Sequence, residues 1–175
     1  MTSSKLRASS IIAAFLVGLS GLALAQDGDD EPDPAILRLV LADDAPTTLQ
    51  VAIAASERQG IPISAKFAMS DSDIHLSVYT ATANGLVETV LNPKTGTVSS
   101  AQPITDAEDL ADARVQKAAM EKATVSLRTA TERAIAENAD SRAVSAVPQL
   151  RNGHVIARVK LQRSSDSITV SEPLN

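Results

Sequence analysis

The chain has 175 residues, of which 16 are basic and 21 acidic, and its formal net charge at neutral pH is −5. Aromatic residues make up only 2% of it, so the chain lacks the basic patches and stacking rings that bind nucleic acids. Binding to an anionic membrane surface is disfavoured for the same electrostatic reason. The absence of cysteine excludes disulfides and removes the thiolate ligands of many zinc sites.

Residues 1–25 have the features of a secretory signal peptide. Lys5 and Arg7 give a positive start, residues 11–24 are apolar, and a small-residue cleavage site follows. A transmembrane anchor is the alternative, but this apolar run of about 14 residues is shorter than the roughly 20 that span a bilayer. We therefore expect a mature chain that starts at Gln26, has no membrane span and is periplasmic or secreted.

Residues 26–46 are predicted to be an acidic leader followed by a short apolar element. The segment 26–34 combines acids with Gly and Pro, cannot bury apolar surface, and is expected to be disordered. The apolar residues 36–41 are too few to decide between helix and strand. Calcium binding by the leader, or by Asp43 and Asp44, is disfavoured because the alternating ligands and central glycine of an EF-hand loop are missing.

Residues 47–98 have the pattern of a helix followed by an antiparallel sheet. Thr48 is suited to cap a helix that ends at Gly60. The apolar alternation from Ile74 to Val78 indicates a half-buried strand. The predicted strands are residues 63–69, 74–82 and 86–91.

Residues 99–124 are predicted to form a linker helix. Thr105 and Glu108 have the spacing of a capping box, in which a hydroxyl and a carboxylate satisfy free N–H groups at the helix start. The acids of this segment lie early and the bases late, an order that stabilises the helix dipole.

Residues 125–175 repeat the pattern of residues 47–98. Ser126 corresponds to Thr48 as a helix cap, and a second apolar alternation starts at Val155. The helix starts are 78 residues apart and the paired strands 81 apart, which places a three-residue insertion in the second helix-to-strand connection. The predicted strands are residues 143–150, 154–162 and 167–170.

Two Asn-Gly pairs, Asn84-Gly85 and Asn152-Gly153, predict tight hairpin turns because both residues tolerate positive φ. Each repeat spans only about 50 residues, a size at which burial is marginal. We therefore expect the two repeats to pack together, or to share the helix between them.

The Ser/Thr-Leu-x-x-Ala helix start, the alternating strand and the closing turn at residues 92–98 resemble the PepSY domain family. The match covers residues 47–98 and, less completely, 125–175, because residues 171–175 lack the closing Lys-Thr-Gly turn. The resemblance implies an α+β fold of two related, somewhat cystatin-like units, each a helix packed on a small antiparallel sheet, joined by a central helix. It also implies an exported or membrane-associated protein that inhibits or regulates peptidases, without catalytic residues.

The sequence predicts no catalytic, cofactor or metal site. His75 and His154 are the only histidines and lie in different repeats, whereas a zinc site needs three or four converging ligands. The segment 70–75 contains Ser, Asp and His, but close neighbours in one tight turn rarely reach triad geometry. A turn stabilised by Ser and Asp side chains explains these residues fully.

Four basic residues lie on the last predicted hairpin. They could contact an acidic partner or the acidic first repeat of a neighbouring copy. Charges also protect an edge strand from unwanted pairing, and we favour this last interpretation. The four residues are Arg151, Arg158, Lys160 and Arg163.

The sequence therefore predicts an exported, non-catalytic binding or regulatory module, such as a peptidase inhibitor or modulator, that acts through surface contacts. Its expected partner is another envelope protein or a peptidase, and an edge strand could add an extended segment of that partner. The alternative is a structural or chaperone-like envelope protein without a peptidase partner.

Overall fold

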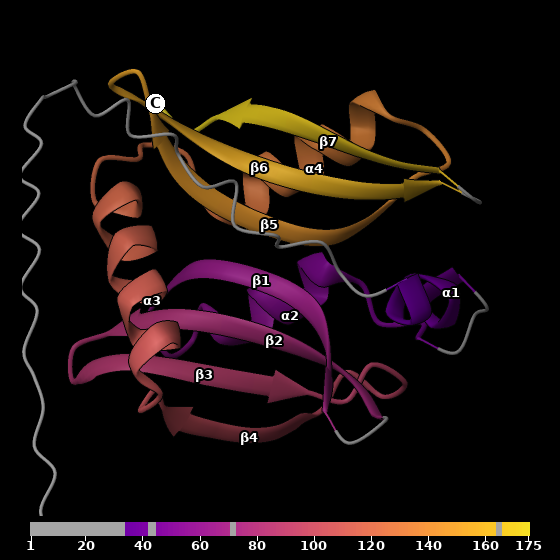
Figure 1. Cartoon of the computed structure of the whole chain (residues 1–175), viewed down its shortest axis with the longest axis horizontal. Coiled ribbons are helices and arrows are strands. Elements are labelled where there is room, and N and C mark those ends of the chain that lie inside the picture. Colours follow the sequence, from indigo (N-terminus) through magenta and orange to yellow (C-terminus); the bar gives the residue numbers. More distant parts are fainter. Residues whose placement is uncertain (1–33, 42–44, 71–72, 164–165) are drawn as a thin grey trace, which may run out of the picture. The chain divides into compact units, whose positions relative to one another are not determined.

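The computed structural model describes residues 34–41, 45–70, 73–163 and 166–175. These residues form an α+β fold in which four helices pack on one antiparallel sheet (Figure 1). The helices are α1 (Pro34–Leu41), α2 (Leu49–Ser56), α3 (Ala107–Met120) and α4 (Leu127–Glu137). The strands are β1 (Ile61–Ser70), β2 (Asp73–Thr82), β3 (Gly85–Leu91), β4 (Val98–Pro103), β5 (Arg142–Arg151), β6 (His154–Arg163) and β7 (Asp166–Pro173).

Several sequence-based predictions lie outside the described residues: the signal peptide at 1–25, residues 26–33 of the acidic leader, and the pair Asp43 and Asp44. Pro34, predicted as the end of the leader, is instead the first residue of α1. The apolar element at 36–41, whose type the sequence left undecided, is part of α1. Within the described ranges, none of the helices has the length and apolar character needed to cross a bilayer.

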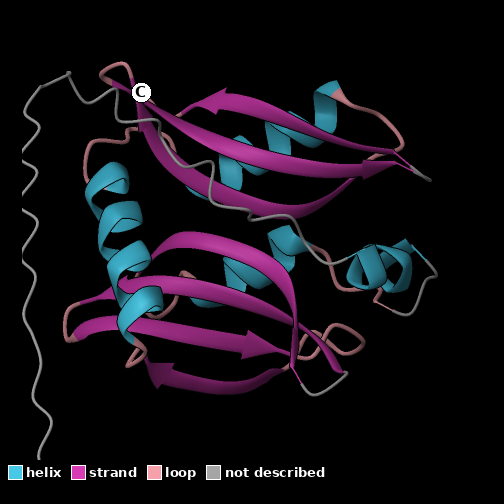
Figure 2. Ribbon diagram, in the orientation of Figure 1, coloured by secondary structure: helices cyan, strands magenta, loops and turns pink. Residues whose placement is uncertain are grey.

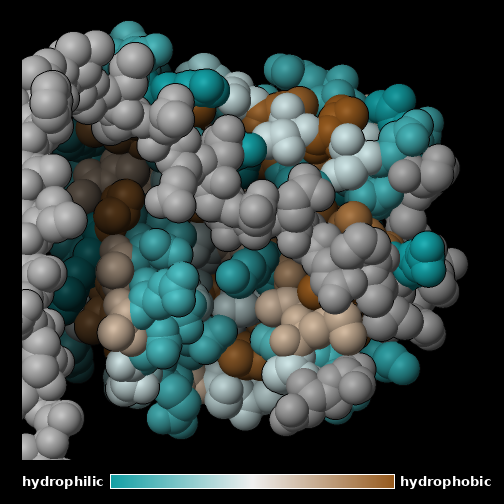
Figure 3. Space-filling view, viewed as in Figure 1, coloured by the Kyte–Doolittle hydropathy of each residue, from teal (hydrophilic) through white to brown (hydrophobic). Residues whose placement is uncertain are grey.

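The helices lie on both faces of the sheet. Helices α2 and α4 cover one face, and α3 lies on the other face against β1 and β5 (Figure 2). The main core fills the space between the sheet and α2 and α4, with Leu49, Phe67 and Leu127 among its fully buried side chains. The outer side of α3 carries both charged and apolar residues (Figure 3), among them Val115, which is 69% exposed.

The predicted caps of α2 and α4 are confirmed. Ser126 Oγ accepts a hydrogen bond from the Thr129 N–H at 3.1 Å. Thr48 Oγ1 accepts from the Val51 N–H at 3.4 Å, a longer contact. Each hydroxyl satisfies one N–H group that has no partner within its helix.

The predicted cap of α3 is wrong by one residue. Asp106, not Thr105, is the N-cap, and its carboxylate accepts from the N–H groups of Glu108 and Asp109 at 2.9 and 3.1 Å. A carboxylate here also adds a negative charge at the positive end of the helix dipole, which a threonine cannot do.

The sheet is larger than the sequence predicted, and the expectation of two small sheets is wrong in this respect. The described residues contribute seven strands to one sheet, in the order β4-β3-β2-β1-β5-β6-β7. The two halves join where β1 pairs with β5, at Ala65–Ala146 and Lys66–Ser145. The segment 99–124, predicted as a linker helix, begins instead in β4 and continues as α3.

Both halves of the sheet have the same strand register. Strands β1, β2 and β3 correspond to β5, β6 and β7 when 81 is added to each residue number. The bulge that follows Pro62 recurs after Ala143. Ala65 and Ala146 are equivalent under this relation and also lie directly opposite each other, so an approximate twofold axis passes between them.

One of the two predicted hairpin turns is confirmed. Asn152 and Gly153 have φ angles of 51° and 82° and form the two-residue loop between β5 and β6. The Asn84-Gly85 prediction is wrong by one residue, because Thr82 pairs with Gly85 and the two residues between them form the loop. The Thr82 hydroxyl accepts from the Asn84 N–H at 3.2 Å and stabilises this turn.

Arg142 attaches the N-terminal part of the fold to the second half of the sheet. Its guanidinium donates hydrogen bonds to the carbonyl oxygens of Val40 and Thr47 at 2.9 Å each, and to that of Ala45. It also lies over the Phe67 ring, 5.5 Å from the centroid. The carbonyls near the end of α1 have no donor within the helix, and Arg142 supplies one.

Candidate functional site

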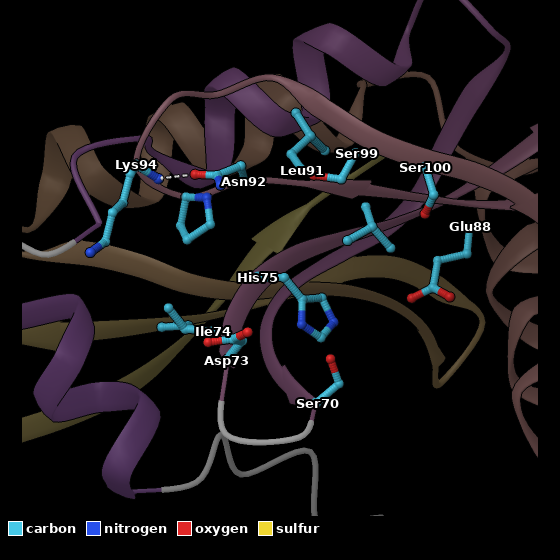
Figure 4. A pocket seen from close by; sticks show the side chains of 12 residues that line it. Ser70, Asp73, Ile74, His75, Glu88, Leu91, Asn92, Lys94, Ser99 and Ser100 are labelled. Atoms are coloured by element: carbon cyan, nitrogen blue, oxygen red, sulfur yellow. Dashed lines mark hydrogen bonds between the residues drawn. The ribbon is translucent and has the colours of Figure 1, made fainter.

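An open groove of about 750 Å³ lies at one end of the first half of the sheet. Strands β1 to β4 and the loop that follows β3 all contribute to it (Figure 4). Most of its chemical groups are polar, with charges of both signs. The polar residues that matter most are Asp73, His75, Glu88, Lys94, Ser99 and Ser100.

The floor of the groove is the polar face of β2 and β3. His75 and Glu88 both reach into it (Figure 4). The carboxylate of Glu88 is held by Ser77, whose hydroxyl donates to Oε1 at 2.5 Å. A hydrogen bond to an ionised acceptor is short and strong, so it fixes the carboxylate in one orientation.

The loop after β3 forms the rim and is held by its own hydrogen bonds. The Asn92 Oδ1 atom accepts from the N–H groups of Lys94 and Thr95 at 2.8 and 3.2 Å, the first of which is drawn in Figure 4. The Pro93 carbonyl accepts from the Thr47 N–H at 3.0 Å, which fastens the loop to the start of α2. The backbone that carries the Lys94 side chain is therefore well anchored.

Helix α3 covers the part of the polar sheet face that lies beyond the groove. Tyr79 is buried there in a small cluster with Ile63 and Ala113. Burial, followed by a hydrogen bond to Asp109, raises the pKa of the Tyr79 hydroxyl far above its usual value. Tyr79 is therefore a packing residue beneath α3.

The residue types of a catalytic triad do not form one here. Ser70, Asp73 and His75 all line the groove, but no hydrogen bond joins these three described residues (Figure 4). Their predicted neighbours Asp71 and Ser72 lie outside the described residues. The groove therefore brings a hydroxyl, a carboxylate and an imidazole to one place.

The two histidines are placed in different halves of the sheet. His75 is half-buried in the groove, and His154 is exposed at the start of β6. Among the residues that the structure describes, no group of three or more His, Asp or Glu side chains is arranged to hold a metal ion.

The four basic residues of the last hairpin do not share the role predicted for them. Strand β6 lies between β5 and β7, so charges on it cannot protect a sheet edge. Arg151 and Arg163 are exposed at strand ends, whereas Lys160 is buried. The interpretation as edge protection is therefore wrong for Arg158, Lys160 and Arg163, because β6 is an inner strand.

The groove residues escaped the sequence prediction because they come from four strands and a loop. A local sign was present, since the polar residues His75 and Ser77 alternate with the apolar residues of β2. The register of the β2–β3 hairpin then places Glu88 diagonally opposite Ser77. The polar alternation of β2 and the register of the β2–β3 hairpin, taken together, would have predicted a polar sheet face at His75, Ser77 and Glu88.

No protein-family model, curated protein or solved structure matches this chain.

Proposed function

We propose that the chain is an exported, non-catalytic binding or regulatory module, made of two PepSY-like and somewhat cystatin-like α+β units. The groove of the first half is its contact site for a segment of another envelope protein, with a peptidase as the leading candidate. The observation that carries this proposal is that the groove residues His75 and Glu88 are replaced by other residue types at the equivalent positions of the second half, although the backbone plan is common to both.

The buried framework positions hold similar residues in both halves. Val78 corresponds to Val159 under the offset of 81, and Ala65 corresponds to Ala146. All four are buried. Similar packing requirements explain this similarity.

The groove positions differ between the halves. His75 corresponds to Ile156, and Glu88 corresponds to Thr169. Folding of the same backbone plan does not require His and Glu at these positions, since the second half folds without them. These side chains are therefore free to serve binding.

The chemistry of the groove suits a polar segment of a protein. Sites for small apolar ligands are lined mostly by hydrophobic and aromatic side chains. This groove instead offers a carboxylate at Glu88, an ammonium at Lys94 and hydroxyls at Ser99 and Ser100. An open groove with such donors and acceptors can hold a polar peptide by several hydrogen bonds at once.

A capture experiment tests the proposal. Immobilised mature chain is incubated with envelope extract at physiological salt, beside a Lys94→Glu variant and a matched Lys122→Glu variant. Both lysines are exposed, but Lys122 follows α3 and does not line the groove. The proposal predicts that Lys94→Glu loses the partner and Lys122→Glu retains it.

Recovery of no partner, or equal recovery by both variants, would overturn the groove as the contact site. A second arm measures the activity of purified peptidases with and without the chain. Slower hydrolysis supports a peptidase as the partner. Unchanged hydrolysis, combined with partner capture, favours a structural or chaperone-like envelope role.

A further inference from the structure

We propose that the outer edge of β7 is a second acceptor site, which takes up an extended, uncharged segment of a partner protein by strand addition. This site is separate from the groove. It lies along β7, the outer strand at the opposite edge of the sheet from β4 (Figure 1). The argument comes from the first half of the molecule, where the equivalent strand already carries an added strand.

Strand β7 is the counterpart of β3. The β2–β3 hairpin closes with the pair Thr82–Gly85, and the β6–β7 hairpin closes with Arg163–Asp166, 81 residues later. In the first half, β4 pairs along the outer edge of β3. In the second half, none of the described residues pairs with the outer edge of β7.

The backbone groups of β7 are arranged as those of β3 are. The Ile104 N–H donates to the Leu86 carbonyl at 3.0 Å, so alternate residues of β3, starting with Leu86, bond to β4. The Leu174 N–H donates to the Val155 carbonyl at 2.9 Å, so the alternate residues of β7 that bond to β6 include Val170.

The remaining β7 residues therefore direct their N–H and C=O groups outward. They are Ser167, Thr169, Ser171 and Pro173, of which Pro173 offers only its carbonyl because proline has no N–H. The first three are the counterparts of Leu86, Glu88 and Val90, the β3 residues that bond to β4.

The nature of the occupant can be read from β4. Val98–Pro103 contains no charged residue, and Pro103 lies opposite Val87 of β3. The counterpart of Val87 is Ile168, which is 40% exposed. An added strand with an apolar residue at the matching position would cover Ile168, and the outward positions of β7 carry none of the charges that normally protect an edge.

A partner segment fits this edge better than a second copy of the chain. Two β7 strands paired around Thr169 would place Asp166 of one copy opposite Glu172 of the other. Like charges directly opposite each other destabilise an antiparallel pair. An uncharged segment from a different protein avoids this repulsion.

The test uses the mature chain and a blocked synthetic peptide with the sequence of residues 97–104. Hydrogen exchange should slow at the amides of Ser167, Thr169 and Ser171 when the peptide is added. Thr169→Pro removes an outward N–H without touching the β6–β7 pairing and should weaken binding about fivefold to tenfold. Ala101→Pro, at an outward position of β4, is the matched control and should leave the affinity unchanged.

A peptide methylated on its backbone amides keeps the test valid if Thr169→Pro does not fold, because it removes the pairing groups from the ligand instead. The proposal expects no binding of this peptide. Absence of binding by the unmodified peptide, or protection confined to β3 or β4, would overturn it. Concentration-dependent self-association through β7 without peptide would overturn it as well, and would identify a second copy as the occupant.

Discussion

The first and second halves of the sheet share one backbone plan but end in different ways. In the first half β4 covers β3, and the polar groove opens beside it. In the second half β7 is itself the edge, and Ile156 and Thr169 stand at the positions of the groove residues His75 and Glu88. Packing constrains the shared positions, so differences between the halves mark where function can be sought.

The largest predicted effects test whether the two cores are equivalent. Leu49 and Leu127 occupy matching places at the starts of α2 and α4, and both are fully buried. Leu49→Ala and Leu127→Ala should each lower the free energy of unfolding by about 2–5 kcal/mol, because each leaves a cavity. Urea unfolding measures both values, and a negligible cost for either variant would show that its half lacks a packed core.

The next effect concerns a position at which the two halves carry different residue types. Arg142 stands where the first half has Ile61. Arg142→Ile removes three hydrogen bonds to carbonyls near α1 and should cost about 3 kcal/mol. Ile61→Arg is the control, since Ile61 is 61% exposed, and should change stability by less than about 0.5 kcal/mol.

Thermal unfolding of both variants would decide this point. If both substitutions changed the stability by the same small amount, the contacts of Arg142 would contribute nothing measurable. The two halves would then differ less than the structure indicates.

Smaller effects are expected at the helix caps. Ser126→Ala should cost about 1 kcal/mol, and Thr48→Ala somewhat less because its hydrogen bond is longer. Chemical denaturation of the two variants gives the ranking. A larger loss for Thr48→Ala than for Ser126→Ala would contradict the cap geometry.

The smallest effect depends on pH. Glu172 stands where the first half has the buried Leu91, and its own burial, followed by repulsion from Glu137, raises its carboxyl pKa, although Arg133 partly offsets this. A raised pKa in the folded state means that the contribution of Glu172 to stability is most favourable below the unfolded pKa of 4.5. That contribution is lost as the pH rises through the folded pKa.

Glu172→Gln should therefore stabilise the chain at pH 7, by less than about 1 kcal/mol. Below pH 4.5 the gain should vanish, because the native carboxyl is then protonated as well. Melting temperatures at the two pH values measure this, and a gain of the same size at both would refute the assigned cause.

Elements encoded by neighbouring residues could be predicted from the sequence. The apolar alternation from Ile74 predicted β2, and Asn152-Gly153 predicted the β5–β6 turn. Strand β4 could not be predicted, because Val98–Pro103 shows no apolar alternation. Its extended form depends on pairing with β3, a contact that local propensity does not encode.

The continuous sheet could not be predicted for a related reason. The two halves join through Ala65 and Ala146 and one neighbouring pair. An alanine in the sequence does not indicate which other strand its own strand will pair with. The groove was hidden because its polar groups are separated in sequence and meet only once the strands are paired. The sequence therefore indicated the repeat, but it indicated neither the continuous sheet that the two copies form nor the groove.

The most direct test of this account is a disulfide across the approximate twofold axis. Residues directly opposite each other on antiparallel strands have Cα atoms about 4.5–5.5 Å apart, within the range of a disulfide. The chain has no cysteine of its own, so an Ala65→Cys/Ala146→Cys variant can form only one intramolecular bond.

The control is an Ala65→Cys/Val147→Cys variant, in which one side chain projects from the opposite sheet face. Mass spectrometry after mild oxidation measures bond formation in both. We predict nearly complete oxidation of the 65/146 pair and almost none of the 65/147 pair. No disulfide in the first variant, or equal amounts in both, would contradict the claim that the two halves meet at equivalent residues in one sheet.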